Sequence, residues 1–192
     1  MTDLHFTICP RRDRFGLKGP GAEPWLAAHG IPLPPAPNSW TGATHADDPA
    51  IWVARLGAAE FFLEDHAGGT TLRGIEPSAE SHPPGVYPVL REDASFLLAG
   101  PASLEVLAQV CNVDFGNLPL EARPVIMTSM IGVSVLVAPQ IAGARTLGAE
   151  PARGGAHAPR QYRIWCDPSF GPYLGESLGT VVRECGGQKG SI

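Results

Sequence analysis

Apolar residues in the last part of the chain change their spacing at residue 167. In 161–166 they alternate, with Tyr162, Ile164 and Cys166 on one face, which predicts a strand. Asp167-Pro168 is a helix-start signal, and Gly186-Gly187 is a stop signal, so a helix is predicted over 168–185. The apolar face predicted for this helix comprises Phe170, Tyr173, Leu174, Leu178, Val181, Val182 and Cys185.

The same two spacings recur earlier. Alternation from Leu4 to Cys9 predicts a strand. Gly-Pro steps at Gly19-Pro20 and Gly100-Pro101 precede helices predicted near 20–29 and 101–111. Paired β-prone runs predict hairpins near 51–64 and 125–137.

These elements form a weak internal repeat, since each predicted helix is followed by a hairpin. The polar, proline-containing loop over 66–85 is the natural boundary between the copies. The sequence therefore predicts an α+β protein with two small helix-plus-antiparallel-sheet units. They comprise residues 1–84 and residues 85–192, and the second also holds the strand over 161–166 and the helix over 168–185.

Composition narrows the class of protein. The 192 residues are 44% hydrophobic, which is enough for a core, and 23 Gly with 20 Pro favour short elements joined by turns. A net charge of −5 and the lack of a basic run argue against a nucleic-acid partner. No apolar run is long enough to span a membrane, and we expect a cytoplasmic protein.

No side-chain pattern predicts a catalytic, cofactor-binding or metal-binding residue. The chain has no G-x-G-x-x-G, P-loop or G-x-S-x-G motif in the required context. The four cysteines have no metal-ligand spacing and are expected to be reduced thiols, with Cys111, Cys166 and Cys185 on apolar faces. The acid-histidine clusters are Asp65-His66 and His45 with Asp47-Asp48, and neither has the spacing of a site.

Several residues are candidates for contacts rather than chemistry. Arg11, Arg12 and Arg14 form either an arm that lies on a partner or a solvated edge, and the loop over 138–160 is a second candidate contact. Trp40 lies in a predicted loop and could anchor another subunit, whereas Trp25, Trp52 and Trp165 are expected in the core. Arg163 beside Trp165 could present a cation to an acid or be an ordinary surface arginine.

Motifs spread over nearly the whole chain resemble the gamma subunit of heterotetrameric sarcosine oxidase, and also the corresponding subunit of N-methylglutamate dehydrogenase. The combination is specific, although no single motif is. The motifs are Arg14-Phe-Gly-Leu-Lys-Gly-Pro-Gly-Ala22 with Trp25-Leu26, Val53-Ala-Arg-Leu-Gly57 with Glu60-Phe61, Tyr87 to Phe96 with Gly100-Pro101 and Val113-Asp-Phe115, Met127-Thr-Ser-Met-Ile-Gly-Val133, and Tyr162-Arg-Ile-Trp-Cys-Asp167 with Phe170 to Leu174.

The resemblance implies a subunit without catalytic residues of its own, with a fold like that of folate-binding aminomethyltransferases. Its expected partners are alpha, beta and delta subunits. These subunits are expected to carry FAD, FMN, NAD, zinc and tetrahydrofolate. The complex is expected to demethylate sarcosine to glycine, transfer the one-carbon unit to tetrahydrofolate and produce hydrogen peroxide.

Two alternatives stay open. The chain could belong to an N-methylglutamate dehydrogenase or another complex that oxidises N-methyl amines, or it could be a free-standing folate-binding protein. Fold resemblance alone does not carry folate binding, and Thr128-Ser-Met-Ile-Gly132 is more apolar than a folate-site turn should be.

Overall fold

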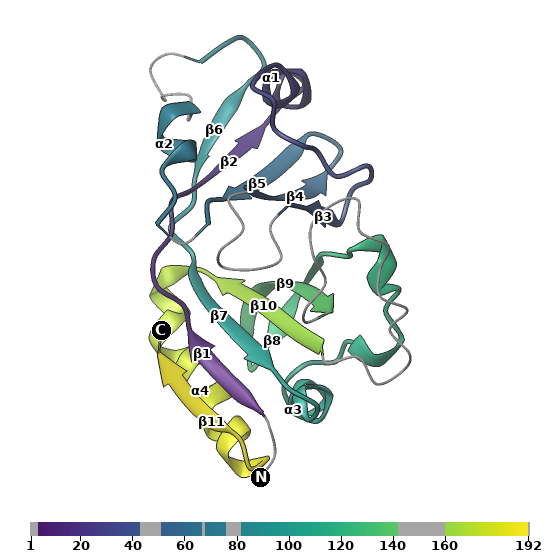
Figure 1. Cartoon of the computed structure of the whole chain (residues 1–192), viewed down its shortest axis with the longest axis vertical. Helices are drawn as coiled ribbons and strands as arrows, with labels where there is room; N and C mark the ends of the chain where they lie inside the picture. Colours follow the sequence, from purple (N-terminus) through teal and green to yellow (C-terminus); the bar gives the residue numbers. More distant parts are fainter. Residues whose placement is uncertain (1–3, 43–50, 67, 76–81, 142–159, 192) are drawn as a thin grey trace. The chain divides into compact units, whose positions relative to one another are not determined.

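The computed structural model describes residues 4–42, 51–66, 68–75, 82–141 and 160–191, which divide into two compact units (Figure 1). Unit 1 contains residues 4–11, 93–141 and 160–191. Unit 2 contains residues 12–42, 51–66, 68–75 and 82–92. Each unit combines one largely antiparallel sheet with helices, so the predicted α+β class is confirmed.

Unit 2 is built on a five-stranded antiparallel sheet in the order β3-β4-β5-β2-β6. Phe15 and Leu17 of the inner strand β2 pack with Leu26 of α1 and Leu72 of α2 in one buried cluster. A sheet with one face covered in this way needs inward apolar residues at every second position. Its elements are β2 (Arg14–Lys18), α1 (Ala22–Ala28), β3 (Ser39–Thr41), β4 (Trp52–Gly57), β5 (Glu60–Glu64), α2 (Thr71–Ile75) and β6 (Tyr87–Leu90).

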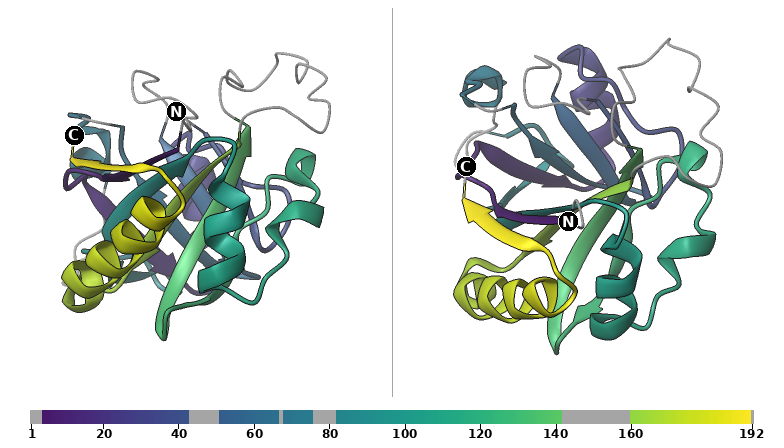
Figure 2. Two further views of the ribbon diagram at one scale, coloured as in Figure 1. Left: turned by 90° about the horizontal axis from the view of Figure 1, so that it is seen from below. Right: turned by 60° about the horizontal axis from the view of Figure 1, so that its bottom comes forward.

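Unit 1 is built on a six-stranded sheet in the order β11-β1-β7-β10-β9-β8, in which only β1 and β11 run parallel. Helices α3 and α4 lie on the same face of this sheet (Figure 2). Its elements are β1 (His5–Ile8), β7 (Ala94–Ala99), α3 (Ser103–Val110), η1 (Phe115–Asn117), η2 (Leu120–Ala122), β8 (Ile126–Met130), β9 (Val133–Ile141), β10 (Arg160–Cys166), η3 (Pro168–Phe170), α4 (Gly171–Glu184) and β11 (Gln188–Ser191).

The strand-to-helix step predicted at residue 167 is confirmed. β10 buries Tyr162, Ile164 and Cys166 in the core of unit 1. The carboxylate of Asp167 then accepts the backbone N–H of Ser169 at 2.8 Å, which caps the short helix η3 before α4 begins. The predicted helix is thus a 3₁₀ turn followed by an α-helix of 14 residues.

The predicted apolar face of α4 is confirmed at Leu174, Leu178 and Val182, which are buried in the core, but not at its first two aromatic residues. Phe170 and Tyr173 are 51% and 53% exposed, whereas Gly171, Gly175 and Gly179 are buried. A methyl group on Gly171 would lie 2.7 Å from Cβ of Ala94, and one on Gly175 would lie 3.0 Å from the ring of Phe96. The glycines let the helix approach β7 closely, and this rotates the aromatic side chains to the surface.

The two predicted hairpins are present as β4–β5 and β8–β9. In the second, Ile131 and Gly132 have φ of +50° and +81°, which is the pattern of a two-residue type I′ turn. β9 continues to Ile141, so the first residues of the predicted 138–160 loop are strand; residues 142–159 lie outside the described part of the chain.

The division into units differs from the predicted one at 84/85. β1 of the N-terminal segment pairs with β7 and β11 of unit 1, while β6 stays in unit 2 beside β2. Strands so far apart in sequence are joined by tertiary pairing, which hydrophobic spacing does not encode. Among the described residues, no helix is both long and apolar enough to cross a membrane.

Candidate functional site

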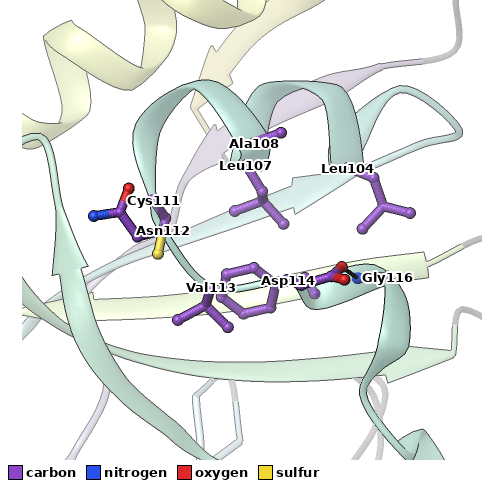
Figure 3. Close-up of a pocket in the computed structure, with 9 residues that line it drawn as sticks. Leu104, Leu107, Ala108, Cys111, Asn112, Val113, Asp114 and Gly116 are labelled. Carbon is purple, nitrogen blue, oxygen red and sulfur yellow. Dashed lines mark hydrogen bonds between the residues drawn. The ribbon is translucent and has the colours of Figure 1, made fainter.

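A pocket of about 470 Å³ lies between α3 and the loop that follows it in unit 1 (Figure 3). Leu104 and Leu107 point from the helix toward the loop that carries Val113 and Asp114. The lining residues are Leu104, Leu107, Ala108, Cys111, Asn112, Val113, Asp114, Phe115 and Gly116. A pocket lined mainly by apolar side chains with a few polar groups is the usual form of a small-ligand or side-chain site.

Local hydrogen bonds shape the loop side of this pocket. The carboxylate of Asp114 accepts the backbone N–H of Gly116 at 2.9 Å and the side-chain amide of Asn117 at 2.7 Å, an Asx turn that starts η1. Arg160 of β10 donates to the backbone oxygens of Phe115 and Gly116 at 3.0 and 3.2 Å. The loop is therefore attached to the central part of the sheet.

The chemistry available in the pocket is limited. The Cys111 thiol lies 3.6 Å from the Thr128 hydroxyl, and both oxygens of Asp114 already hold the turn. Among the described residues, no group of three or more His, Cys, Asp or Glu side chains could hold a metal ion. The arrangement offers van der Waals contact to an apolar group, without a base beside a nucleophile.

The Asp65-His66 pair belongs to the frame of unit 2. The buried Asp65 carboxylate accepts the backbone N–H of His66 at 2.9 Å and that of Leu72 in α2 at 3.1 Å. The His66 ring nitrogen lies 3.0 Å from the same carboxylate. These contacts join the end of β5 to α2. The cluster of His45, Asp47 and Asp48 lies outside the described residues.

The last residue of the predicted arginine arm, Arg14, begins a strand. Arg14 lies in β2, buried, and its Nε donates to the Glu64 carboxylate at 2.5 Å, while Arg12 approaches the same carboxylate at 3.6 Å. Both sequence-based interpretations, a partner arm and a solvated edge, are therefore wrong for Arg14, whereas Arg12 is only partly buried. The acid that binds them is 50 residues away from Arg14 in the chain, so no local pattern revealed the pair.

The other residues singled out in the sequence also have structural partners. Trp40, predicted in a loop as an anchor for another subunit, is instead buried in β3, where its ring stacks on Trp52 at 6.1 Å. The guanidinium of Arg163 lies 4.7 Å from the ring centre of Trp165, a cation–π contact.

Burial governs the titration of two groups in β10. It raises the pKa of the Cys166 thiol to about 11, with smaller contributions from Asp93 and Asp167, and it also raises the pKa of Tyr162. A thiol with such a pKa is protonated and unreactive at neutral pH. All four cysteines are free; Cys111 and Cys166 are buried as expected, whereas Cys9 and Cys185 are partly exposed.

Two solved structures share the fold over nearly the whole chain. One is a chain of the heterotetrameric sarcosine oxidase from Corynebacterium sp. U-96 in complex with pyrrole 2-carboxylate, at 24% identity and a TM-score of 0.66; the match covers 94% of this chain and 84% of that one. The other is the glycine cleavage system aminomethyltransferase T from Bartonella henselae, at 15% identity and a TM-score of 0.59, with 97% and 47% coverage.

No protein-family profile and no curated protein sequence matches the chain. The chain spans about half the length of the aminomethyltransferase and most of the length of the sarcosine oxidase chain. The resemblance predicted from the sequence motifs is therefore confirmed at the level of the fold: this protein has the fold shared by a chain of heterotetrameric sarcosine oxidase and part of an aminomethyltransferase.

Proposed function

We propose that this protein is a non-catalytic assembly subunit, of gamma type, in a heterotetrameric flavin-dependent complex that oxidises the N-methyl group of sarcosine. The observation that carries the proposal is the fold match to a sarcosine oxidase chain, which covers 94% of this chain and 84% of that one. The sequence motifs from Arg14 to Leu174 point to the same subunit.

The contacts of the acidic residues support a structural role. Glu64 neutralises Arg14 inside unit 2, Asp65 binds the first turn of α2, and Asp114 and Asp167 each hold the start of a 3₁₀ helix. Carboxylates used in this way stabilise the fold and are not positioned to exchange protons with a substrate.

In the proposed complex the chemistry belongs to other chains. Alpha, beta and delta subunits would carry FAD, FMN, NAD, zinc and tetrahydrofolate. The reaction would convert sarcosine to glycine, pass the one-carbon unit to tetrahydrofolate and produce hydrogen peroxide. This chain would contribute surface for assembly, and we place it with the complex in the cytoplasm.

The test is gentle isolation of the tagged chain from its native cells, followed by identification of the accompanying polypeptides and an absorption spectrum. We expect three further chains in fixed ratio and a flavin spectrum. Sarcosine-dependent formation of peroxide by that material is expected, whereas N-methylglutamate turnover without peroxide would assign the complex to the dehydrogenase type. A lone, colourless, monodisperse chain would overturn the proposal.

The second candidate is a free-standing folate-binding protein, favoured by the fold match to part of an aminomethyltransferase. It predicts that the isolated chain binds a reduced folate directly. Tetrahydrofolate at a hundred times its dissociation constant should then stabilise the chain by about 2.7 kcal/mol, seen as a higher melting temperature. No shift at saturating folate, with adenosine as the matched control, would eliminate this candidate.

A further inference from the structure

The pocket beside α3 combines apolar walls with one acidic side chain. Leu104, Leu107 and Phe115 contribute hydrocarbon to it, and Leu107 and Phe115 are buried. Asp114 is the only charged residue among the described residues that line the pocket. A volume of about 470 Å³ is in the range of sites for small molecules. The charge of Asp114 therefore bears directly on which small molecule the pocket can bind.

The Asp114 carboxylate can accept further hydrogen bonds. An ionised carboxylate has about four acceptor positions, and the Gly116 N–H and the Asn117 amide use two of them, at 2.9 and 2.7 Å. The side chain is exposed, and in the described part of the chain no lysine or arginine forms an ion pair with it. Arg160 donates instead to the backbone oxygens of Phe115 and Gly116 and does not line the pocket. The turn therefore holds the carboxylate in place with its charge available.

The opposite end of the pocket is electronegative as well. In Figure 3 Asp114 lies toward Leu104, whereas Cys111 and Asn112 lie at the end where the helix stops. Helix α3 ends at Val110, and its last turn contains no basic residue. The C-terminal end of a helix carries a partial negative charge of about half a unit. An anionic ligand would therefore be repelled at both ends of the pocket.

We propose that this pocket binds a small organic amine, with the ammonium group at Asp114 and the hydrocarbon part against Leu104 and Leu107. The site does not depend on the proposed assembly role. A primary amine is charged at neutral pH, as the lysine side chain is. Its N–H groups fill the remaining acceptor positions of the carboxylate, and its carbon chain is removed from water by the apolar walls. A carboxylic acid is repelled by Asp114, and an alcohol of the same length lacks the charge.

Three probes that share one hexyl chain separate the effect of charge from that of the hydrocarbon. Hexylamine, 1-hexanol and hexanoate are each titrated into the tagged full-length protein, in the form in which it is isolated. Hydrogen–deuterium exchange of the peptide that spans 104–117 reports binding at the pocket itself. We expect hexylamine to slow this exchange saturably, 1-hexanol to need about fivefold higher concentration, and hexanoate to have no effect.

Two substitutions test the two parts of the site. Asp114→Asn removes the charge and keeps a side-chain oxygen for the Gly116 N–H, so it should abolish the preference for hexylamine over 1-hexanol. Its control is Asp167→Asn, the same change at the exposed cap of η3, which does not line the pocket. Leu104→Ala removes apolar wall and should weaken the binding of both probes by about threefold. Its control is Leu118→Ala, which packs on the same core outside the pocket.

Each remaining outcome decides the inference. Equal effects of hexylamine and hexanoate, or no saturable effect of hexylamine, would overturn it. An effect of hexylamine in the isolated chain that is absent from an assembled complex would identify a lysine side chain of a partner as the occupant and overturn the small-molecule assignment. Urea unfolding shows whether each variant is folded; if Asp114→Asn is not, the three probes on the natural protein decide alone. A lone chain that binds hexylamine would refute the proposed function and leave this site standing.

Discussion

The sheets of unit 2 and unit 1 can be matched strand by strand through their pairing registers. In unit 2 Leu63 pairs with both Phe15 and Val53. In unit 1 Ile164 pairs with both Phe96 and Val137, and all three lie in the core as their counterparts do. The match pairs strand β4 with β9, β5 with β10, and β2 with β7.

The match also changes the account of the internal repeat. In the sequence repeat, the hairpin over 51–64 corresponds to the hairpin over 125–137. In the strand orders of the two sheets, β4–β5 instead correspond to β9–β10, and β3 corresponds to β8. The first strands are exchanged: β1 occupies in unit 1 the place that β6 occupies in unit 2, and each continues into a strand of the other unit. The two units therefore repeat one sheet topology, and the first strand of each copy is exchanged with that of the other.

The units differ most on the sheet face opposite their helices. Arg14 and Glu64 form a buried ion pair in unit 2, and the same registers in unit 1 hold Ser95 and Trp165, which are also buried. A buried ion pair is no more stabilising than a well-packed apolar pair, but it is costly to break. The fold therefore accommodates either a buried ion pair or an uncharged pair at this position, provided that no charge is buried alone.

The largest expected effect comes from breaking the ion pair. Glu64→Gln should lower the free energy of unfolding by about 3–5 kcal/mol, because it removes the negative charge of the carboxylate that binds the buried guanidinium of Arg14. The control is Glu60→Gln on the same strand, which removes an exposed pair with Lys18 and should cost less than about 1 kcal/mol. Urea unfolding measures both.

Replacement of both partners extends this test. The double variant Arg14→Met/Glu64→Leu removes both buried charges, and unit 1 has no charge at the matching positions, so the variant should recover most of the stability that Glu64→Gln loses. A Glu64→Gln variant within about 1 kcal/mol of the natural protein, or a double variant as unstable as the single one, would contradict the comparison.

A smaller effect is expected from the helices. Gly171→Ala should destabilise the protein by about 1–3 kcal/mol, because the added methyl lies 2.7 Å from Cβ of Ala94. Gly74→Ala in α2 meets nothing within 4 Å and should stabilise the protein by about 0.4–1 kcal/mol. Thermal unfolding measures both variants. If Gly171→Ala and Gly74→Ala shifted the melting temperature in the same direction, close packing of α4 would not be the cause.

A still smaller effect is expected from the charge at the start of η3. Hydrogen bonds from the Ser169 hydroxyl and then its N–H lower the pKa of Asp167. Its contribution to stability is therefore present above the unfolded pKa and is lost as the pH falls through the folded pKa. On acidification the urea midpoint of the natural protein should fall more than that of Asp167→Asn. Ser169→Ala should bring the pKa back toward its ordinary value, measured by NMR titration.

The last prediction concerns the reactivity of the cysteine thiols and not the stability of the fold. Cys166 is the last residue of β10, at the position that matches Asp65 in unit 2, and burial raises the pKa of its thiol to about 11. Iodoacetamide at neutral pH should label the partly exposed Cys9 and Cys185 in the folded protein and leave Cys166 unmodified until urea is added. Labelling of Cys166 at the rate of Cys9 would show that the thiol is accessible.

The sequence predicted elements well where the signal is local. Asp167-Pro168 marked the step from β10 into a helix, and Gly100-Pro101 preceded α3. It failed where a residue's surroundings come from distant segments. Phe170 and Tyr173 have helical apolar spacing, yet the glycines of α4 fit against β7 and leave both rings exposed. Trp40 stood among polar and proline residues and is nonetheless buried against Trp52.

The candidate site was not predictable from residue spacing. Leu104, Leu107 and Cys111 follow the helical period of a core face, and only the position of the loop at Asp114, held by Arg160 of β10, leaves a pocket beside them. The position of β8 at the edge of the unit 1 sheet was not predictable either, because the outermost strand is known only from the order of the whole sheet.

The sequence by itself determined the local elements, the α+β class and the family resemblance, because caps, turns and apolar periods act over a few residues. Only the tertiary structure decided the exchange of β1 and β6, the burial of Arg14 with Glu64 and the position of β8 at a sheet edge. These depend on pairings between residues that are far apart in the chain. The free energy of such pairings comes from burial and hydrogen bonding in the assembled sheet, which no short segment contains.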